Sequence, residues 1–267
     1  MRTLGHAWYW LLDYLYVAYW QVQGFLFRID PSHYRGPELT GRPVLLIPGI
    51  YETWQFMRPV ADLVRKRGSP VHVVPTLHWN TATVASSADL VAEYLEEHDL
   101  RNVLVVAHSK GGLIGKYAML RRDPSGRIAR MIAISTPFSG SVYARWFLLR
   151  SIRDFSPADP TLRMLGEQLE ANSRITSIWG AFDPHIPGGS RLEGATNVVL
   201  HSSGHFRIFG QRDLLEAVGL ALDDKPAVPD GATSVEPAPG DSAGRTSRRP
   251  PSRRGGPGAR SAAEDQE

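Results

Sequence analysis

Hydrophobic residues along the chain fall into short uninterrupted runs separated by longer amphipathic stretches. Stretches with helical spacing cover residues 56–67, 84–98, 112–121 and 214–222. The short runs fit buried β-strands, and they cover residues 44–47, 71–74, 103–107, 131–135, 175–179 and 197–200. Strands that alternate with helices predict βαβ units and a parallel sheet. We therefore predict an α/β fold over residues 29–222, with a mostly parallel central sheet and helices on both faces.

The N-terminal segment, residues 1–28, is dense in aromatic side chains. Its apolar residues recur at three- to four-residue spacing, which predicts a helix with an apolar stripe of Trp8, Leu12, Leu15, Tyr19, Val22 and Leu26. Asp13 interrupts the segment, and a charge at the middle of a bilayer is costly. Three alternatives stay open: the helix packs on the body, lies at a membrane interface, or spans the membrane.

No aliphatic core with a small-residue cleavage site is evident near the N-terminus, as a secretory signal would require. We therefore expect a cytoplasmic protein, with membrane association through peripheral contact of residues 7–27 as the open alternative.

The other end of the chain changes composition sharply. Residues 223–267 contain no Ile, Leu, Phe, Tyr or Trp, so they cannot bury enough apolar surface to fold, and we predict a disordered tail. This tail carries seven basic and eight acidic residues, a net charge of about −1, so the positive charge of the chain, about +4, belongs to the rest of it. No nucleic-acid-binding motif accompanies its arginines, and we expect no nucleic-acid partner. The absence of cysteine excludes disulfides, a cysteine nucleophile and thiolate metal ligands.

The segment after the third predicted strand has the spacing of a nucleophile elbow. Ala107-His108-Ser109-Lys110-Gly111-Gly112 joins a buried strand to a helix, with small residues two positions before and after the serine. Only small residues fit these positions in so tight a turn. The serine hydroxyl then stands exposed at the positive end of the following helix. Ser109 is therefore the candidate nucleophile.

A serine needs a base to take its proton and an acid to orient that base. Asp183 follows the predicted strand at 175–179, and His205 follows the one at 197–200. In folds with this kind of elbow, the serine, the acid and the histidine follow one another along the chain in that order, so we predict Asp183 as the acid and His205 as the base. Asp154 and Asp159 are less favoured acids, and His185 and His201 less favoured bases.

Acyl chemistry also needs donors for the developing oxyanion. The first strand runs into Pro48-Gly49-Ile50, where glycine allows the backbone to turn back toward the serine. We predict the backbone N–H groups of Ile50 and Lys110 as the two donors.

The sequence resembles the α/β-hydrolase superfamily, and most closely small bacterial lipases and esterases with an A-H-S-x-G-G elbow. The resemblance covers about residues 40–222 and rests on P-V-L-L-I-P-G-I at 43–50, V-A-H-S-K-G-G at 106–112, S-T-P-F-S-G-S at 135–141, S-I-W-G-A-F-D at 177–183 and S-G-H at 203–205. It implies hydrolysis of carboxylic esters without cofactor or metal, with the roles given above for Ser109, Asp183 and His205. Pro48 stands where such lipases usually have histidine, and the charged Lys110 follows the serine.

The stretch at 138–172, which contains the apolar run 143–149, lies where this superfamily inserts caps, so we expect a small cap over the site or a helix packed on the sheet. We predict an esterase or lipase acting on an ester or lipid substrate. The same trio would also serve an acyltransferase, a thioesterase or an amidase. A non-catalytic membrane-associated binding protein on a hydrolase fold is the alternative from another class.

Overall fold

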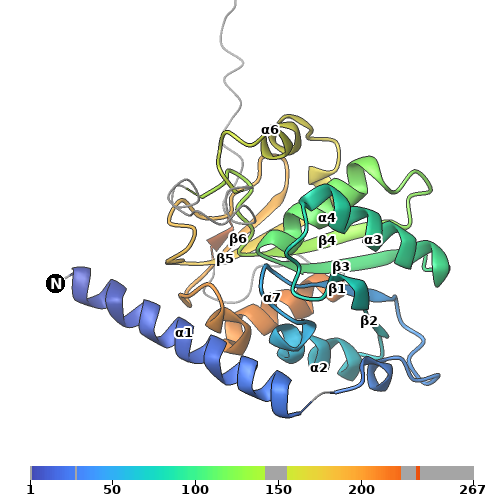
Figure 1. Ribbon diagram of the computed structural model, residues 1–267, viewed down its shortest axis with the longest axis horizontal. Helices are drawn as coiled ribbons and strands as arrows, with labels where there is room; N and C mark the ends of the chain where they lie inside the picture. The colour runs from blue at the N-terminus through green and yellow to red at the C-terminus, as the bar shows by residue number, and fades with distance from the viewer. Residues whose placement is uncertain (1, 28, 142–154, 224–232, 235–267) are drawn as a thin grey trace, which may run out of the picture. The chain divides into compact units, whose positions relative to one another are not determined.

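The computed structural model describes residues 2–27, 29–141, 155–223 and 233–234, without the side chains of residues 2–7 and 234. Within this part a seven-stranded sheet runs in the order β2-β1-β3-β4-β5-β6-β7 (Figure 1). The strands are β1 (Val44–Ile47), β2 (Val71–Val73), β3 (Val103–His108), β4 (Ile128–Ile134), β5 (Ile175–Gly180), β6 (Thr196–Leu200) and β7 (Thr233–Ser234). Strands β1–β6 are parallel, and β7 pairs antiparallel with β6. The predicted α/β fold with a mostly parallel sheet is confirmed.

The strands coincide closely with the apolar runs because most of them are buried along their whole length. The largest difference from the predicted bounds is at β4, which begins at Ile128, three residues before the predicted start. Ala129 and Arg130 are only half-buried, so the hydrophobic pattern does not reveal them, yet Arg130 pairs with Leu104 of β3.

Helices cover both faces of the sheet. The helices of the described residues are α1 (Arg2–Leu26), α2 (Arg58–Lys66), α3 (Val84–Glu97), α4 (Lys110–Arg121), α6 (Pro160–Glu167) and α7 (Arg212–Leu222). One core lies between the sheet and α3, α4 and α6, and a second lies between the opposite face and α2 and α7 (Figure 1). Alternate residues of β1, β3 and β4 enter the two cores, as Leu45 and Leu46 of β1 do.

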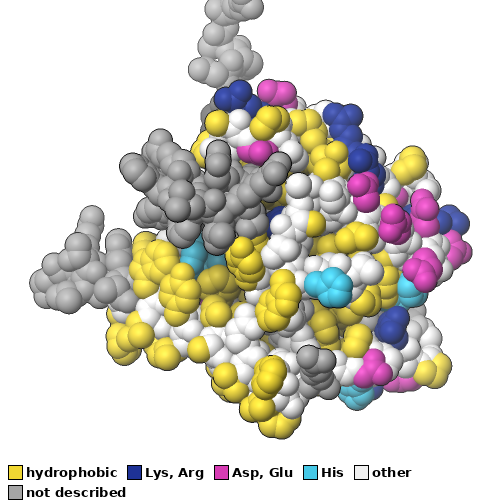
Figure 2. All heavy atoms as spheres, viewed as in Figure 1, with side chains coloured by type: hydrophobic (Ala, Val, Ile, Leu, Met, Phe, Trp, Pro, Cys, Tyr) yellow, Lys and Arg dark blue, Asp and Glu magenta, His cyan; other side chains and the backbone are white. Residues whose placement is uncertain are grey.

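Helix α1 contacts the 3₁₀ turns Trp54–Met57 and Arg207–Gly210, which follow β1 and β6. It therefore lies at the carboxyl ends of the strands. The apolar stripe seen in the sequence points outward: Trp8, Leu15, Tyr19 and Val22 are each more than half exposed. Figure 2 shows hydrophobic side chains gathered along this helix. Among the described residues, no helix combines the length and hydropathy that crossing a membrane requires.

Two predicted segments fall largely outside the described residues. Of the expected cap, residues 142–154 lie outside, and the described remainder contains α6. Of the expected tail, residues 224–232 and 235–267 lie outside. Inside the tail, Thr233 and Ser234 pair with Val199 and Val198 of β6.

Candidate active site

Ser109 occupies the sharp turn between β3 and α4. Its φ of 49° is positive, a strained conformation for a residue with a side chain. The turn passes so close to β1 that a Cβ on Gly111 would lie 2.2 Å from the carbonyl oxygen of Ile47. A Cβ on Gly112 would lie 2.0 Å from Oγ1 of Thr136. Both glycines are therefore required by close approach, and the strained turn places Ser109 at the N-terminus of α4.

The structure brings Ser109, His205 and Asp183 together from three separate turns. His205 Nε2 lies 3.1 Å from Ser109 Oγ, and His205 Nδ1 lies 2.8 Å from Asp183 Oδ2. The other carboxylate oxygen of Asp183 accepts the backbone N–H groups of His185 and Ile186, at 2.8 and 3.0 Å. An ionised Asp183 accepts a hydrogen bond from Nδ1–H, which leaves Nε2 of His205 free to accept the serine proton.

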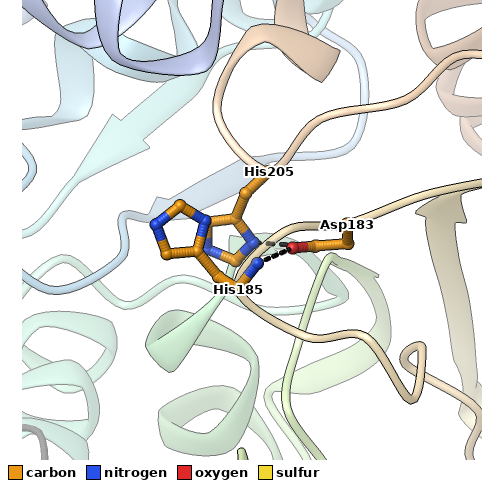
Figure 3. Close-up of side chains that lie close together, drawn as sticks. All are labelled: Asp183, His185 and His205. Carbon is orange, nitrogen blue, oxygen red and sulfur yellow. Dashed lines mark hydrogen bonds and ion pairs between the residues drawn. The ribbon is translucent and has the colours of Figure 1, made fainter. Parts of the chain in front are cut away.

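The less favoured candidates lie elsewhere. Asp159 caps α6 by accepting the N–H groups of Thr161 and Leu162, and Asp154 is outside the described residues. His201 is exposed. His185 packs against His205 with ring centroids 4.8 Å apart (Figure 3), so it is part of the site without taking the place of His205.

The charges around His205 increase its affinity for a proton. Burial opposes protonation of its ring, but the charge and hydrogen bond of Asp183, together with the charges of Asp13 and Glu52, raise the pKa of His205. Burial also opposes ionisation of Asp183, yet His205 and the backbone hydrogen bond from His185 lower the pKa of this carboxyl. Burial, reinforced by His205, lowers the pKa of His185 to about 3, so this neighbouring ring is neutral near pH 7.

Asp183, His185 and His205 are the described group whose side chains could hold a metal ion, with ligand atoms within 4.8 Å of one another. Figure 3 shows His205 turned toward Asp183. Both ring nitrogens of His205 are engaged, one by Asp183 and one by Ser109. The hydrogen bonding of this group therefore suits proton transfer better than metal coordination.

The loop after β1, which carries Ile50, is held by a buried glutamate that the sequence analysis did not single out. Glu52 Oε2 accepts the N–H of Gly49 at 2.8 Å, and His108 Nδ1 lies 2.8 Å from the same oxygen. Glu52 is 2% exposed and His108 is fully buried. Ile50 lines the same cavity as Ser109, and Lys110 is the residue directly after Ser109. The oxyanion roles of the Ile50 and Lys110 N–H groups stay predictions.

The side chain of Lys110 points neither to solvent nor into the cavity. It is fully buried, and its Nζ donates to the carbonyls of Asn80, at 3.0 Å, and Ala82. Asn80 in turn donates from Nδ2 to the carbonyl of Pro48, at 2.7 Å. Lys110 and Asn80 thus hold the loop that follows β1 at Pro48.

A cavity of about 520 Å³ opens beside Ser109 and His205. Helix α1 supplies one wall, with Trp10, Tyr14 and Val17. The facing walls are also mostly apolar, and they include Ile50, Phe56, Pro137, Phe155, Ile186 and Phe206. The N-terminal helix therefore helps to form the site, which the sequence pattern did not predict.

The strand order, the elbow and the position of the site are those of the α/β-hydrolase fold, and comparison with solved structures shows this fold. No protein-family model and no curated protein sequence matches the chain. Lipase B of Aspergillus fumigatus aligns with a TM-score of 0.56 at 17% identity, over 75% of this chain and 59% of its own. The propeptide form of the Bacillus licheniformis lipase BlEst2 aligns with a TM-score of 0.53 at 16% identity, over 65% of this chain and 48% of its own.

The mature form of the same Bacillus lipase gives a TM-score of 0.50 at 17% identity, over 65% of this chain and 88% of its own. This chain thus spans about half of the propeptide form and six-tenths of the Aspergillus lipase. At these identities the likeness shows the fold alone.

Proposed function

We propose that this protein is a serine hydrolase that cleaves carboxylic esters through an acyl-enzyme on Ser109. The observation that carries the proposal is the chain of two hydrogen bonds from Ser109 through His205 to Asp183, set on a strained elbow. A serine in this setting is activated by the adjacent base, and that base is oriented by a buried carboxylate.

In the proposed reaction, Ser109 Oγ attacks the ester carbonyl while its proton passes to Nε2 of His205. Asp183 stabilises the imidazolium through Nδ1–H. His205 then gives the proton to the leaving alkoxide, which departs as an alcohol. A water molecule, deprotonated by the same histidine, attacks the acyl-enzyme and releases a carboxylic acid. The N–H groups of Ile50 and Lys110 would donate to the oxyanion in both steps.

The lining of the cavity supports an apolar acyl chain as the substrate part that it binds. Aromatic and aliphatic side chains from α1 and from the loops after β1, β4, β5 and β6 surround the space beside Ser109. Transfer of an alkyl chain from water to such a lining is favourable by about 0.8 kcal/mol per CH₂ group. The polar side chains in the lining include Ser109, His185 and His205 of the site.

The exposed stripe of α1 supports a lipid surface as the source of such substrates. We define the outer face of α1 as Trp8, Leu11, Leu15, Tyr19 and Val22, which are 48–57% exposed. Tyr14 is 51% exposed and also lines the cavity, so the outer face is continuous with the cavity wall. Tryptophan and tyrosine favour the interface between lipid headgroups and acyl chains.

Labelling with a fluorophosphonate and turnover of p-nitrophenyl esters of increasing chain length test the proposal. We expect S109A to abolish both. S141A changes a serine of the same cavity whose hydroxyl donates to the His185 carbonyl, and we expect it still to be labelled. Equal labelling of S109A and wild type would refute the assignment. With glycerol added, free acid as the main product supports hydrolysis, whereas an acylglycerol would indicate acyl transfer.

Co-sedimentation with phosphatidylcholine vesicles tests the role of the outer face. The double variant L15S/Y19S should bind vesicles less than wild type. L169S removes a similarly exposed leucine elsewhere and should bind as wild type does. Equal binding by all three proteins would refute a lipid contact through α1.

A further inference from the structure

The one acidic residue of α1 is buried at the active site. Asp13 lies on an otherwise apolar stretch of the helix and is fully buried. Its Oδ2 accepts the backbone N–H of His205 at 2.8 Å. Its Oδ1 accepts the N–H groups of Phe206 and Arg207, at 3.0 and 2.9 Å. A single carboxylate thus binds three consecutive N–H groups in the turn that carries the histidine.

The residue before His205 is shaped for this contact. Gly204 has a φ of 121°, which favours glycine, and a Cβ there would lie 2.8 Å from Asp13 Oδ1. The backbone of the turn can therefore approach the carboxylate of α1 only because residue 204 has no side chain.

The other peptide group of His205 is held from the opposite side. His108 Nε2 lies 3.1 Å from the carbonyl oxygen of His205. A carbonyl only accepts hydrogen bonds, so this nitrogen carries the hydrogen and donates it. The N–H of His205 thus bonds to Asp13, its C=O to His108, and its ring to Asp183. Each of the three contacts comes from a different element of the fold.

Five ionisable side chains surround His205. Asp183 and His185 come from the loop after β5, His108 from the end of β3, Glu52 from the loop after β1, and Asp13 from α1. Asp13 Oδ2 also lies 3.9 Å from His185 Nδ1. The charge of Asp13 favours the protonated imidazole, which forms when Ser109 attacks.

We propose that Asp13 is a positioning residue for His205: its carboxylate fixes the turn that carries the imidazole and places a negative charge beside it. This inference rests on the proposed function, since it assigns Asp13 a part in proton transfer through His205. Asp13 acts through the histidine and does not reach the ester.

The variant D13N separates charge from shape. Asparagine keeps one oxygen for the N–H groups of Phe206 and Arg207, but its NH₂ group takes the place of the oxygen that accepts from His205. We expect kcat on a soluble p-nitrophenyl ester to fall about 10-fold or more, the scale of one charge-assisted hydrogen bond. The acid limb of the kcat/KM–pH profile should move to lower pH, because removing the charge makes His205 less basic.

D123N is the matched control. Asp123 also accepts two backbone N–H groups, those of Arg127 and Ile128 at 2.7 and 2.8 Å, and these lie at the amino end of β4, away from the site. We expect D123N to keep the wild-type kcat and acid limb. The variant D13E keeps the charge but displaces the oxygens, so we expect a lower kcat with the acid limb in place.

The outcomes separate this inference from the proposed function. Turnover by S109A at the wild-type rate would refute the function itself. An inactive S109A together with a D13N variant that matches D123N in kcat and acid limb would overturn the role of Asp13 and leave the function standing. Should D13N fail to fold, D13E decides, and a wild-type kcat in D13E would overturn the inference.

Discussion

Replacing Glu52 tests how firmly the loop that carries Ile50 must be held. Its Oε2 accepts the N–H of Gly49 at 2.8 Å and lies 2.8 Å from Nδ1 of His108. Because Glu52 is 2% exposed and His108 is fully buried, bulk water cannot supply a replacement hydrogen bond. E52A removes the partner of both groups at once, whereas E52Q keeps an oxygen for the Gly49 N–H and removes the charge.

The size of the effect follows from these two hydrogen bonds. A buried polar group left without a partner costs about 1–3 kcal/mol, so the loss of two such contacts in E52A should lower the free energy of unfolding by roughly 2–6 kcal/mol. That is a large share of the roughly 5–15 kcal/mol that stabilise a typical domain. E52Q should lose less, about 1–3 kcal/mol. Because Gly49 directly precedes Ile50, we also expect kcat to fall more than KM rises, by up to about 100-fold, the lower end of the loss for a missing oxyanion donor.

Urea unfolding followed by circular dichroism, with kcat and KM on a soluble ester, measures both effects. E38A is the control, since Glu38 forms an exposed ion pair with Arg65 and should contribute less than about 1 kcal/mol. If E52A were as stable and as active as E38A, Glu52 would not hold the loop, and the argument for its role would be wrong.

Three further predictions concern buried cations and imidazoles. K110M should lower the free energy of unfolding by about 1.5–3 kcal/mol, the scale of one hydrogen bond to a charged group, and an unchanged urea midpoint would contradict this. Burial lowers the pKa of Lys116 to about 8. Between pH 8 and 10.5 the unfolded chain therefore binds more protons than the folded one, and the free energy of unfolding of the wild type should rise with pH relative to that of K116M. The same difference between the urea midpoints of the two proteins at pH 7.5 and at pH 10 would exclude this. The pKa of His185 is lowered to about 3, so its ring stays neutral in the folded state, whereas in the unfolded state it binds a proton below about pH 6.5. The free energy of unfolding should therefore fall as the pH is lowered from 6.5 to 3, and it should fall less steeply in H185Q. Thermal midpoints of both proteins at pH 7 and 4.5 measure this difference.

Much of the fold could be predicted because buried parallel strands leave a direct mark in the sequence. The run Val44–Ile47 forms β1 with the predicted bounds, since every residue of it is buried. The trio of Ser109, Asp183 and His205 could be proposed for a related reason: each follows a strand, and the carboxyl ends of parallel strands meet at one edge of the sheet.

The residues that support this trio could not be predicted in the same way. Asp13 and Glu52 bond to backbone N–H groups, and any residue other than proline presents such a group, so the partners leave no pattern in the sequence. The side chain of Lys110 could have pointed to solvent or into the cavity, and only the position of the Asn80 and Ala82 carbonyls decides its direction. Likewise, an apolar stripe marks one face of α1 without saying whether the core or the solvent lies beside it.

The two faces of α1 should separate in experiments because they do different things. At about 100° per residue, Leu15 and Tyr19 lie on one side of the helix and Asp13 close to the opposite side, in agreement with their exposure of 55%, 56% and 0%. L15S/Y19S should therefore reduce vesicle binding and turnover of a vesicle-borne ester while leaving kcat on a soluble short-chain ester unchanged, since neither side chain lines the cavity. D13N should lower turnover of both the soluble and the vesicle-borne ester without changing vesicle binding. If L15S/Y19S lowered kcat on the soluble ester as much as D13N does, the outer face would act on the site through the position of the whole helix, and the separation argued from the geometry would fail.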